Sequence, residues 1–234
     1  MKNKRLLVRG AVILVIAVVA YANRARFPGE GGEKSPSVHA LALRGDLDEA
    51  LGESVAKTGP YDTLTACRLV PHDNNDGDSF FVRHDAGEFE LRLYFVDAPE
   101  KYLSDRHESQ RRRVAEQAAE FGIDPEEAVA VGKAAKEFTR RTLQGKEFTV
   151  HTYWEQVYSG DRYYGFVEMP AEEGFLGDVL VANGLARIHT KGPGSKENPV
   201  DTPEGLTFHQ HRDRLYRIEK GAQRADAGAW GLRN

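Results

Sequence analysis

Carboxylate side chains stand at both ends of one short segment of the chain, DNNDGDSFFVRHDAGEFELRLYFVDAPE, residues 73–100. Asp76 and Asp78 precede one apolar run, and Asp97 and Glu100 follow another. Aspartates from separate strand ends that meet in the fold repel each other unless a cation lies between them. Oxygen ligands favour a hard ion such as Ca²⁺ or Mg²⁺, and two carboxylates leave positions for water and phosphate. The spacing therefore predicts a site for a hard metal ion.

Two more side chains in this segment suit phosphate chemistry. Glu100 is not required as a metal ligand, so its carboxylate can take a proton from a water held at the site. Arg92 offers a planar guanidinium that matches phosphate oxygens. Carboxylates, a cation, water and a guanidinium are together what phosphodiester hydrolysis requires.

Simpler interpretations of the segment are weaker. Asp-Gly pairs commonly form hairpin turns, so the motif at residues 76–78 alone would predict no more than a turn. An EF-hand loop does not fit, because with Asp73 in first position Gly77 comes one residue early and His84 stands where the loop needs Glu.

The elements that must position these residues are short strands that come early, with helices between and after them. Alternating apolar residues predict strands at 63–70, 79–84, 88–96, 147–154 and 162–168. Helical periodicity covers 114–121, 124–145, the segment that stops at Asn183-Gly184, and a last helix that contains residues 215–225. In the third strand the alternation buries one face and leaves Arg92 on the other. The order predicts an α+β fold, a small barrel with helices packed against it.

The start of the chain differs in composition from the rest. Four basic residues among the first nine precede the apolar run Gly10 to Ala22, which ends in Ala-Tyr-Ala. This pattern is typical of an export signal, and the run is shorter than the roughly 20 residues of a spanning helix. We predict that residues 1–22 are a signal peptide or an N-terminal anchor, with a membrane tether through residues 6–22 if the leader is retained. The protein is then exported to the periplasm or the extracellular space.

The remaining chain divides into a linker and one domain. Residues 23–60 are rich in Pro, Gly and charge and are predicted to be a linker with a short helix at DLDEALGES, and residues 61–234 form the domain. Residues 32–234 hold 26 basic and 35 acidic side chains, a net charge of −9. An acidic domain must contact nucleic acid through a few placed cations or a metal. Cys67, without a second cysteine to pair with, is interpreted as a buried apolar residue rather than a reactive thiol.

The chain resembles the staphylococcal (micrococcal, thermonuclease-type) nuclease family. DGDS and RLYFVDAPE are similar to that family's DGDT and RLxxVDxPE signatures in the same register. AAKEFTRRTL, RYYGFV, LVANGLARI and a terminal helix ending at Trp230 extend the similarity over about residues 61–231. The resemblance implies a five-stranded OB-type β-barrel with about three packed helices, to which this chain adds an inserted helix near 105–125.

The resemblance also implies an activity, the Ca²⁺-dependent hydrolysis of DNA and RNA with low sequence specificity, leaving 3′-phosphate ends. Such an endonuclease is expected to act as a monomer with no obligate protein partner. Carried over, Asp78, Asp97 and the backbone carbonyl of Ala98 would hold Ca²⁺, Arg92 would bind phosphate and Glu100 would be the general base. The alternative is a catalytically inactive barrel that binds nucleic acid or a protein, and retention of these side chains favours the enzyme.

Some positions depart from the family pattern or remain open. Ala98 replaces a common threonine, which matters little if the carbonyl alone binds metal. Asp76 would lie just outside the metal ligands. Arg111 to Arg113, within the insertion, are interpreted as a solvated helix face rather than a nucleic-acid contact. Tyr163 and Tyr164 suit either base stacking or the core.

The family's second phosphate-binding arginine has two candidate positions. Aligning Asp161-Arg162-Tyr163 with the family's DxYGRxLA pattern places Gly165 on the arginine, whereas aligning RYYGFVE with RGLAYIY places Arg162 there. We prefer Arg162, because packing fixes a barrel strand while the preceding turn can shorten. Arg106 and Lys191 are the next cations to consider.

Two histidines near the last helix form an HxH motif. We interpret His209 and His211 as surface residues rather than as a transition-metal pair, because the motif precedes an amphipathic helix and a third ligand is not evident.

Overall fold

The computed structural model describes residues 56–104, 106–158, 161–169, 174–189 and 191–233. The predicted leader, its tether and the linker up to residue 55 lie outside the described residues, as does the short helix predicted at DLDEALGES. Over the described ranges, no helix combines the length and the apolar character needed to cross a membrane.

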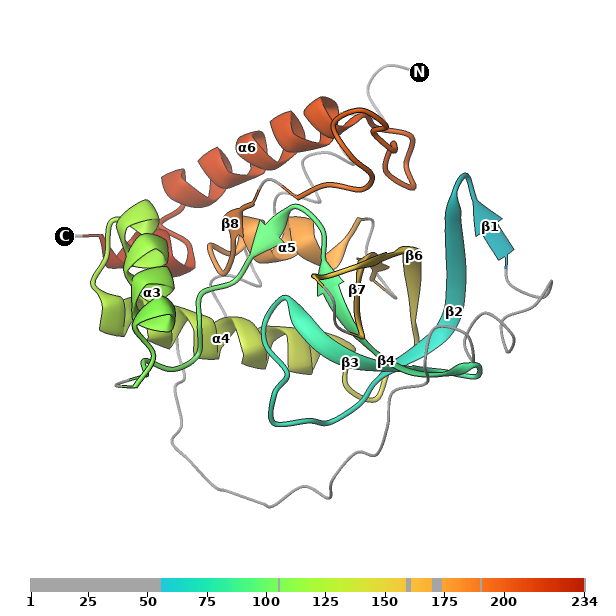
Figure 1. Cartoon of the computed structure of the whole chain (residues 1–234). Helices are drawn as coiled ribbons and strands as arrows, with labels where there is room; N and C mark the ends of the chain where they lie inside the picture. Colours follow the sequence, from blue (N-terminus) through green and yellow to red (C-terminus); the bar gives the residue numbers. More distant parts are fainter. Residues whose placement is uncertain (1–55, 105, 159–160, 170–173, 190, 234) are drawn as a thin grey trace.

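Six strands form the main sheet. They are β1 (Ala56–Thr58), β2 (Tyr61–Leu69), β3 (Ser79–His84), β4 (Gly87–Leu93), β6 (Phe148–Gln156) and β7 (Arg162–Glu168). Their order is β1-β2-β3-β4-β7-β6, and a further β2–β6 pairing closes five of them into a ring (Figure 1). β4 and β7 pair in parallel, and the neighbouring pairs are antiparallel. The ring agrees with the predicted small barrel, while β1 extends the sheet into the predicted linker, ahead of the boundary placed at Tyr61.

Side-chain alternation explains why these segments form a closed sheet. In β4, Phe89, Leu91 and Leu93 are buried, whereas Arg92 lies on the half-buried face, as predicted. Cys67 is a buried free thiol in β2, also as predicted. One face of the ring is therefore apolar and buried, and the other face carries the half-buried Arg92.

Two helices lie between β5 (Val96–Asp97) and β6 in the sequence, and the others follow β7. The helices are α3 (Glu108–Phe121), α4 (Pro125–Leu143), α5 (Leu176–Ala182), α6 (Phe208–Arg224) and the 3₁₀ helix η2 (Gly228–Leu232). The predicted start of α4 is confirmed, because Asp124 N–H donates to Glu127 Oε2 at 2.9 Å and Pro125 is the first helical residue. In Figure 1, α3 stands at the left, α4 runs from the left towards β3, and α6 runs along the top. The α+β class is confirmed.

Helix α3, which covers the predicted insertion near 105–125, is anchored to the fold at its C-terminal end. Phe121 is buried, and its ring packs edge-on against Trp230 of η2 at 4.8 Å. Arg233 Nε donates to the carbonyl of Phe121 at 2.9 Å. The C-terminal segment therefore holds the insertion in place.

Candidate active site

The DGD motif forms a turn that α4 holds in place. A Cβ on Gly77 would lie 2.6 Å from the Cβ of Ala135, so only glycine permits this close packing. Thr139 Oγ1 donates to the Gly77 carbonyl at 2.7 Å. Asp78 follows at the start of β3 and is only 2% exposed.

A sharp bend after β4 brings the second aspartate back towards the first. Phe95 has φ of 64°, a left-handed conformation that is uncommon for a bulky residue. Its N–H donates to the Lys191 carbonyl at 2.8 Å, and its carbonyl accepts from His189 N–H at 2.6 Å. The two-residue strand β5 (Val96–Asp97) follows and pairs with β8 (Arg187–Ile188). Distant backbone thus fixes the bend that aims Asp97.

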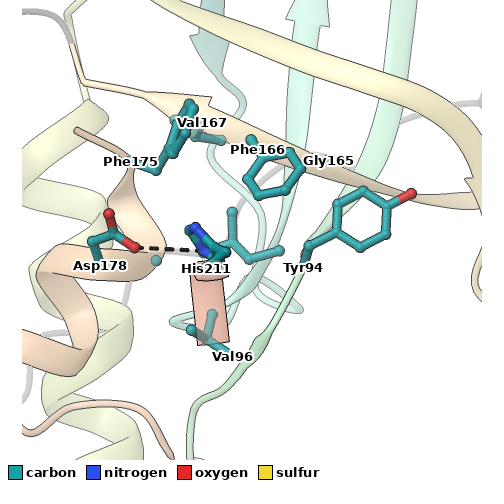
Figure 2. Close-up of a pocket in the computed structure, with 10 residues that line it drawn as sticks. Tyr94, Val96, Gly165, Phe166, Val167, Phe175, Asp178 and His211 are labelled. Carbon is teal, nitrogen blue, oxygen red and sulfur yellow. Dashed lines mark ion pairs between the residues drawn. The ribbon is translucent and has the colours of Figure 1, made fainter. Parts of the chain in front are cut away.

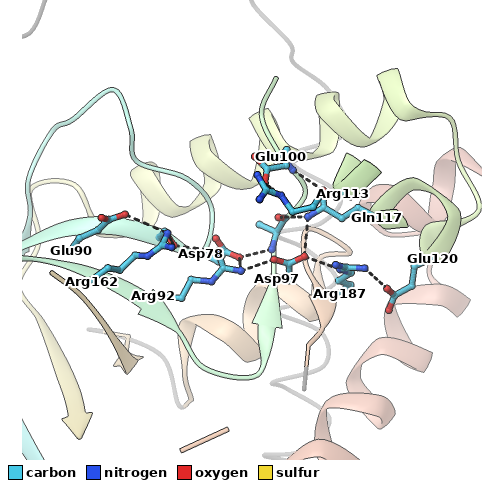
Figure 3. Close-up of polar contacts among 12 residues, drawn as sticks. Asp78, Glu90, Arg92, Asp97, Glu100, Arg113, Gln117, Glu120, Arg162 and Arg187 are labelled. Atoms are coloured by element: carbon cyan, nitrogen blue, oxygen red, sulfur yellow. Dashed lines mark hydrogen bonds and ion pairs between the residues drawn. The ribbon is translucent and has the colours of Figure 1, made fainter. Parts of the chain in front are cut away.

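Asp78 and Asp97 converge on a cation supplied by the chain itself. Nη2 of Arg92 lies 3.1 Å from Asp78 Oδ2 and 2.5 Å from Asp97 Oδ1 (Figure 3). Asp78 Oδ2 also accepts from Ala98 N–H at 2.7 Å. The sequence predicted the convergence of the acids, and the guanidinium offsets their repulsion.

The two carboxyl groups have opposite pKa shifts. Burial raises the pKa of Asp78 to about 7, even though the charge of Arg92 opposes this rise. Burial also acts to raise the pKa of Asp97, but Arg92, Arg187 and Gln117 outweigh it and hold the pKa below its ordinary value. Asp97 is therefore the ionised member of the pair near neutral pH, while Asp78 is poised to ionise beside a cation.

Two residues that the sequence did not single out hold the second oxygen of Asp97. Gln117 Nε2 lies 2.9 Å and Arg187 Nε 2.8 Å from Asp97 Oδ2. Arg187 is directly opposite Asp97 in the β5–β8 pair. A signal for Gln117 existed, because it is a polar residue on the predicted apolar stripe that contains Val114 and Phe121.

Glu100 lies on the loop that directly follows Asp97 and β5, and it contacts α3. Its Oε1 is 3.1 Å from Arg113 Nε, and its side chain is 22% exposed. Its N–H donates to Gln117 Oε1 at 3.0 Å. On the other side, a Cβ on Gly132 of α4 would lie 2.3 Å from the Pro99 carbonyl oxygen. Two helices therefore enclose the loop that carries Glu100.

Arg162 reaches the same hydroxyl group as Arg92. Its Nη1 lies 3.5 Å from Ser79 Oγ, and Nη1 of Arg92 lies 3.4 Å from that oxygen. The parallel β4–β7 pairing places Arg162 opposite Glu90, whose Oε1 is 3.7 Å away. Gly165 fits the core, where a Cβ would lie 2.8 Å from Leu91 Cδ1. Arg162 and Arg92 thus approach one hydroxyl group, and the assignment of the family's second arginine to Arg162 stays a prediction.

Other candidate cations and acids have different partners. Asp76 Oδ1 lies 3.2 Å from Lys101 Nζ. Lys191 Nζ pairs with Glu155 and lies 5.8 Å from the centre of the Tyr164 ring. Arg106 is exposed on the segment that leads into α3. The ion pairs of Asp76 and Lys191 are therefore with residues other than Asp78 and Asp97.

The two tyrosines of β7 differ in environment. Tyr163 is fully buried and belongs to the core, so it cannot stack on a base. Tyr164 is half-buried and stacks on Tyr94 with ring centres 5.0 Å apart and an angle of 19°.

The structure corrects one of the two histidine assignments. His209 is exposed as predicted, but His211 is 2% exposed in a small pocket beside Phe166 and Asp178 (Figure 2). His211 precedes Leu215 by four residues, so both lie on the apolar face of α6. Its Nε2 is 3.7 Å from Asp178 Oδ1. Burial lowers the pKa of His211 to about 4 and raises that of Asp178 to about 6.

Comparison with known proteins identifies the family of this chain. A search of curated proteins found no match. A family model described as staphylococcal nuclease homologue matches residues 90–231, more than half of the chain. The matched range includes Arg92, Asp97, Glu100 and Arg162, and Asp78 lies ahead of it. The chain belongs to the family of staphylococcal nuclease homologues.

Proposed function

We propose that the protein is a Ca²⁺-dependent endonuclease, a hydrolase that cleaves DNA and RNA with low sequence specificity. The observation that carries the proposal is the convergence of Asp78 and Asp97, from separate strand ends, on the guanidinium of Arg92. Two buried carboxylates that already share one cation are a suitable donor set for another. Membership of a nuclease family supports the same chemistry.

The residues at the site fit a hard metal ion. Asp78 and Asp97 would hold it through carboxylate oxygens, and Ala98 through its carbonyl. Burial raises the pKa of Asp78 to about 7, so a cation at its side would favour the ionised form. The described part of the chain has no group of three or more His, Cys, Asp or Glu side chains that could hold a metal, so water and substrate phosphate would complete the coordination. Bound there, Ca²⁺ would polarise the phosphate and acidify a bound water.

The two arginines would bind the scissile phosphate. Arg92 and Arg162 both point at Ser79 Oγ, which places two guanidinium groups on one side of the site. Negative charge grows on the phosphate oxygens in the transition state, and fixed cations stabilise that charge. We infer that Arg92 turns from the carboxylates to the phosphate when substrate binds.

Glu100 would act on the attacking water. Its carboxylate is partly exposed, and its partner Arg113 has 56% of its side chain exposed, so the pair can open to substrate. Water would attack phosphorus and pass a proton to Glu100. The bond from phosphorus to the 5′ oxygen would break, leaving a 3′-phosphate and a 5′-hydroxyl that takes its proton from solvent.

A direct experiment separates this function from the inactive binding module. The purified protein is incubated with fluorescent single-stranded DNA in Ca²⁺ and in excess chelator, and both cleavage and binding are measured. We expect cleavage in Ca²⁺ alone and a loss of at least about a hundredfold in Asp97→Asn. Asp85→Asn, an exposed acid in the β3–β4 turn, is the matched control and should cleave normally. Tight binding without cleavage, independent of Ca²⁺, would instead establish the binding module.

We also propose that the protein is exported and acts as a monomer. Export rests on the basic and apolar pattern of residues 1–22. N-terminal sequencing of protein recovered from culture fractions would show whether the leader is removed or kept as a tether. Recovery of an intact leader in the cytosolic fraction would contradict export.

A further inference from the structure

The inserted helix α3 reaches the site through one buried polar side chain. Gln117 is 2% exposed and lies on the face of α3 that also carries the buried Val114 and Phe121. A buried amide is costly unless its hydrogen bonds are made. Gln117 makes these bonds to the segment that carries the candidate acids.

Gln117 spans that segment with both ends of its amide. Nε2 donates to Asp97 Oδ2 at 2.9 Å and to the Ala98 carbonyl at 3.3 Å. Oε1 accepts from Glu100 N–H at 3.0 Å (Figure 3). The reversed amide would face acceptors with its oxygen and a donor with its nitrogen, so these partners determine its orientation.

These contacts act on one oxygen of Asp97, and the other oxygen faces Arg92. Oδ2 receives Gln117 and also Arg187, whose Nη1 pairs with Glu120 of α3 at 2.7 Å. Oδ1 points to Arg92, beside Asp78. Both supports of Oδ2 therefore depend on α3, which Trp230 holds against the fold.

We propose that Gln117 is a positioning residue, through which the inserted helix orients the Asp97 carboxylate and the backbone at Glu100 for metal binding and hydrolysis. This inference rests on the proposed function. If Gln117 has this role, the inserted helix helps to build the site as well as presenting its arginines to solvent. Side chains that hold metal ligands from behind typically affect metal affinity by ten- to a hundredfold.

Gln117→Met tests the proposal with Gln110→Met as a matched control. Gln110 has the same side chain on the same helix and is also buried, but it bonds Ser104 and Tyr102 instead of the acids. Binding of CaCl₂ alone is measured by calorimetry, and kcat and KM are measured at saturating Ca²⁺. For Gln117→Met we expect roughly tenfold or more weaker Ca²⁺ binding and a similar loss in kcat, with KM within about twofold. Gln110→Met should keep the wild-type Ca²⁺ affinity and the wild-type kcat.

A second variant keeps the test decisive if Gln117→Met does not fold. Glu120 has 45% of its side chain exposed, so Glu120→Ala should fold, and we expect Ca²⁺ binding to weaken roughly two- to fivefold. Wild-type Ca²⁺ affinity and kcat in folded Gln117→Met, or in Glu120→Ala if that variant alone folds, would overturn this inference and leave the proposed function standing. A wild-type protein that neither binds Ca²⁺ nor cleaves would overturn both.

Discussion

Nη2 of Arg92 lies 2.5 Å from Oδ1 of Asp97, so a guanidinium of this chain already occupies the side of the carboxylate that the proposed metal would use. Under the proposed function, Arg92 and Ca²⁺ would compete for the same oxygen in the free protein. Once a phosphate drew Arg92 away, the two cations would act on the same substrate group. We therefore expect the ion pair to have opposite effects on metal binding and on turnover.

Substitution of Arg92 should separate these two effects. In Arg92→Gln we expect kcat to fall by at least about a hundredfold, because a phosphate-binding cation is lost. Ca²⁺ binding without substrate should tighten, since the carboxylates lose their internal cation. Calorimetry with CaCl₂ and steady-state kinetics measure both, and Arg83→Gln, at an exposed position of β3, is the control. Weaker Ca²⁺ binding in Arg92→Gln would mean that the arginine supports the carboxylates rather than competing for them.

Glu100→Gln should lower kcat by on the order of a hundredfold or more, because the amide cannot accept the proton of the attacking water. The substitution preserves size and leaves the backbone bond to Gln117 intact. The measurements are kcat and its pH profile. Glu108→Gln, at the exposed start of α3, should behave as wild type. Near wild-type turnover with an unchanged pH profile would remove Glu100 from the mechanism.

Arg162→Ala should lower kcat by at least about a hundredfold with little change in melting temperature. The expected loss follows from the approach of Arg162 and Arg92 to one hydroxyl, Ser79 Oγ. Arg68→Ala removes an exposed ion pair on β2 and is the control. If Arg162→Ala cuts at the wild-type rate, the site works with one arginine or uses another cation, and Arg106 and Lys191 are the next to test.

The buried pair His211 and Asp178 should shape acid stability. The pKa of His211 falls from 6.5 to about 4 on folding, so the unfolded chain binds its proton first and stability is lost as pH falls through that range. The pKa of Asp178 rises from 3.8 to about 6, so the folded chain binds that proton first and stability is gained as pH falls through the overlapping window. The two contributions oppose each other.

His211→Gln removes the first contribution and leaves the second. As pH falls from 6.5 to 4, the wild type loses this contribution and the variant does not. The unfolding free energy of the variant minus that of the wild type should therefore rise by on the order of 3 kcal/mol over this range. Urea unfolding at a series of pH values measures the difference. His209→Gln, an exposed histidine two residues away, should leave the pH dependence unchanged. Curves for His211→Gln that run parallel to wild type would refute the assignment.

Local patterns predicted the parts of the fold that depend on local forces. Alternation in the segment of β4 placed Arg92 on the half-buried face, and the capping residues at Asp124 placed the start of α4. His211 was wrongly predicted to be a surface residue, although its spacing of four residues from Leu215 places both on one face of a helix. That error came from weighing the HxH motif above the periodicity of the helix that it opens.

Other parts of the site depend on contacts that no local pattern contains. The left-handed Phe95 is held by backbone from Lys191 and His189, far along the chain. Strands β5 and β8 have two residues each, too few for an alternation signal, yet their pairing brings Arg187 to Asp97. Tertiary packing, rather than propensity, fixes these features.

Gly132 lowers the stability of helix α4, but it lets the Pro99–Glu100 backbone pack closely against that helix. A glycine inside a helix usually weakens it by about 0.5–1 kcal/mol relative to alanine, so replacement by alanine is a standard route to thermostability. Here an added methyl group would lie 2.3 Å from the Pro99 carbonyl oxygen and 2.5 Å from that of Glu100. Relief of that clash would push the Glu100 backbone away from α4. A directed search for heat-resistant variants would therefore need to leave this glycine unchanged, although helix propensity alone recommends its replacement.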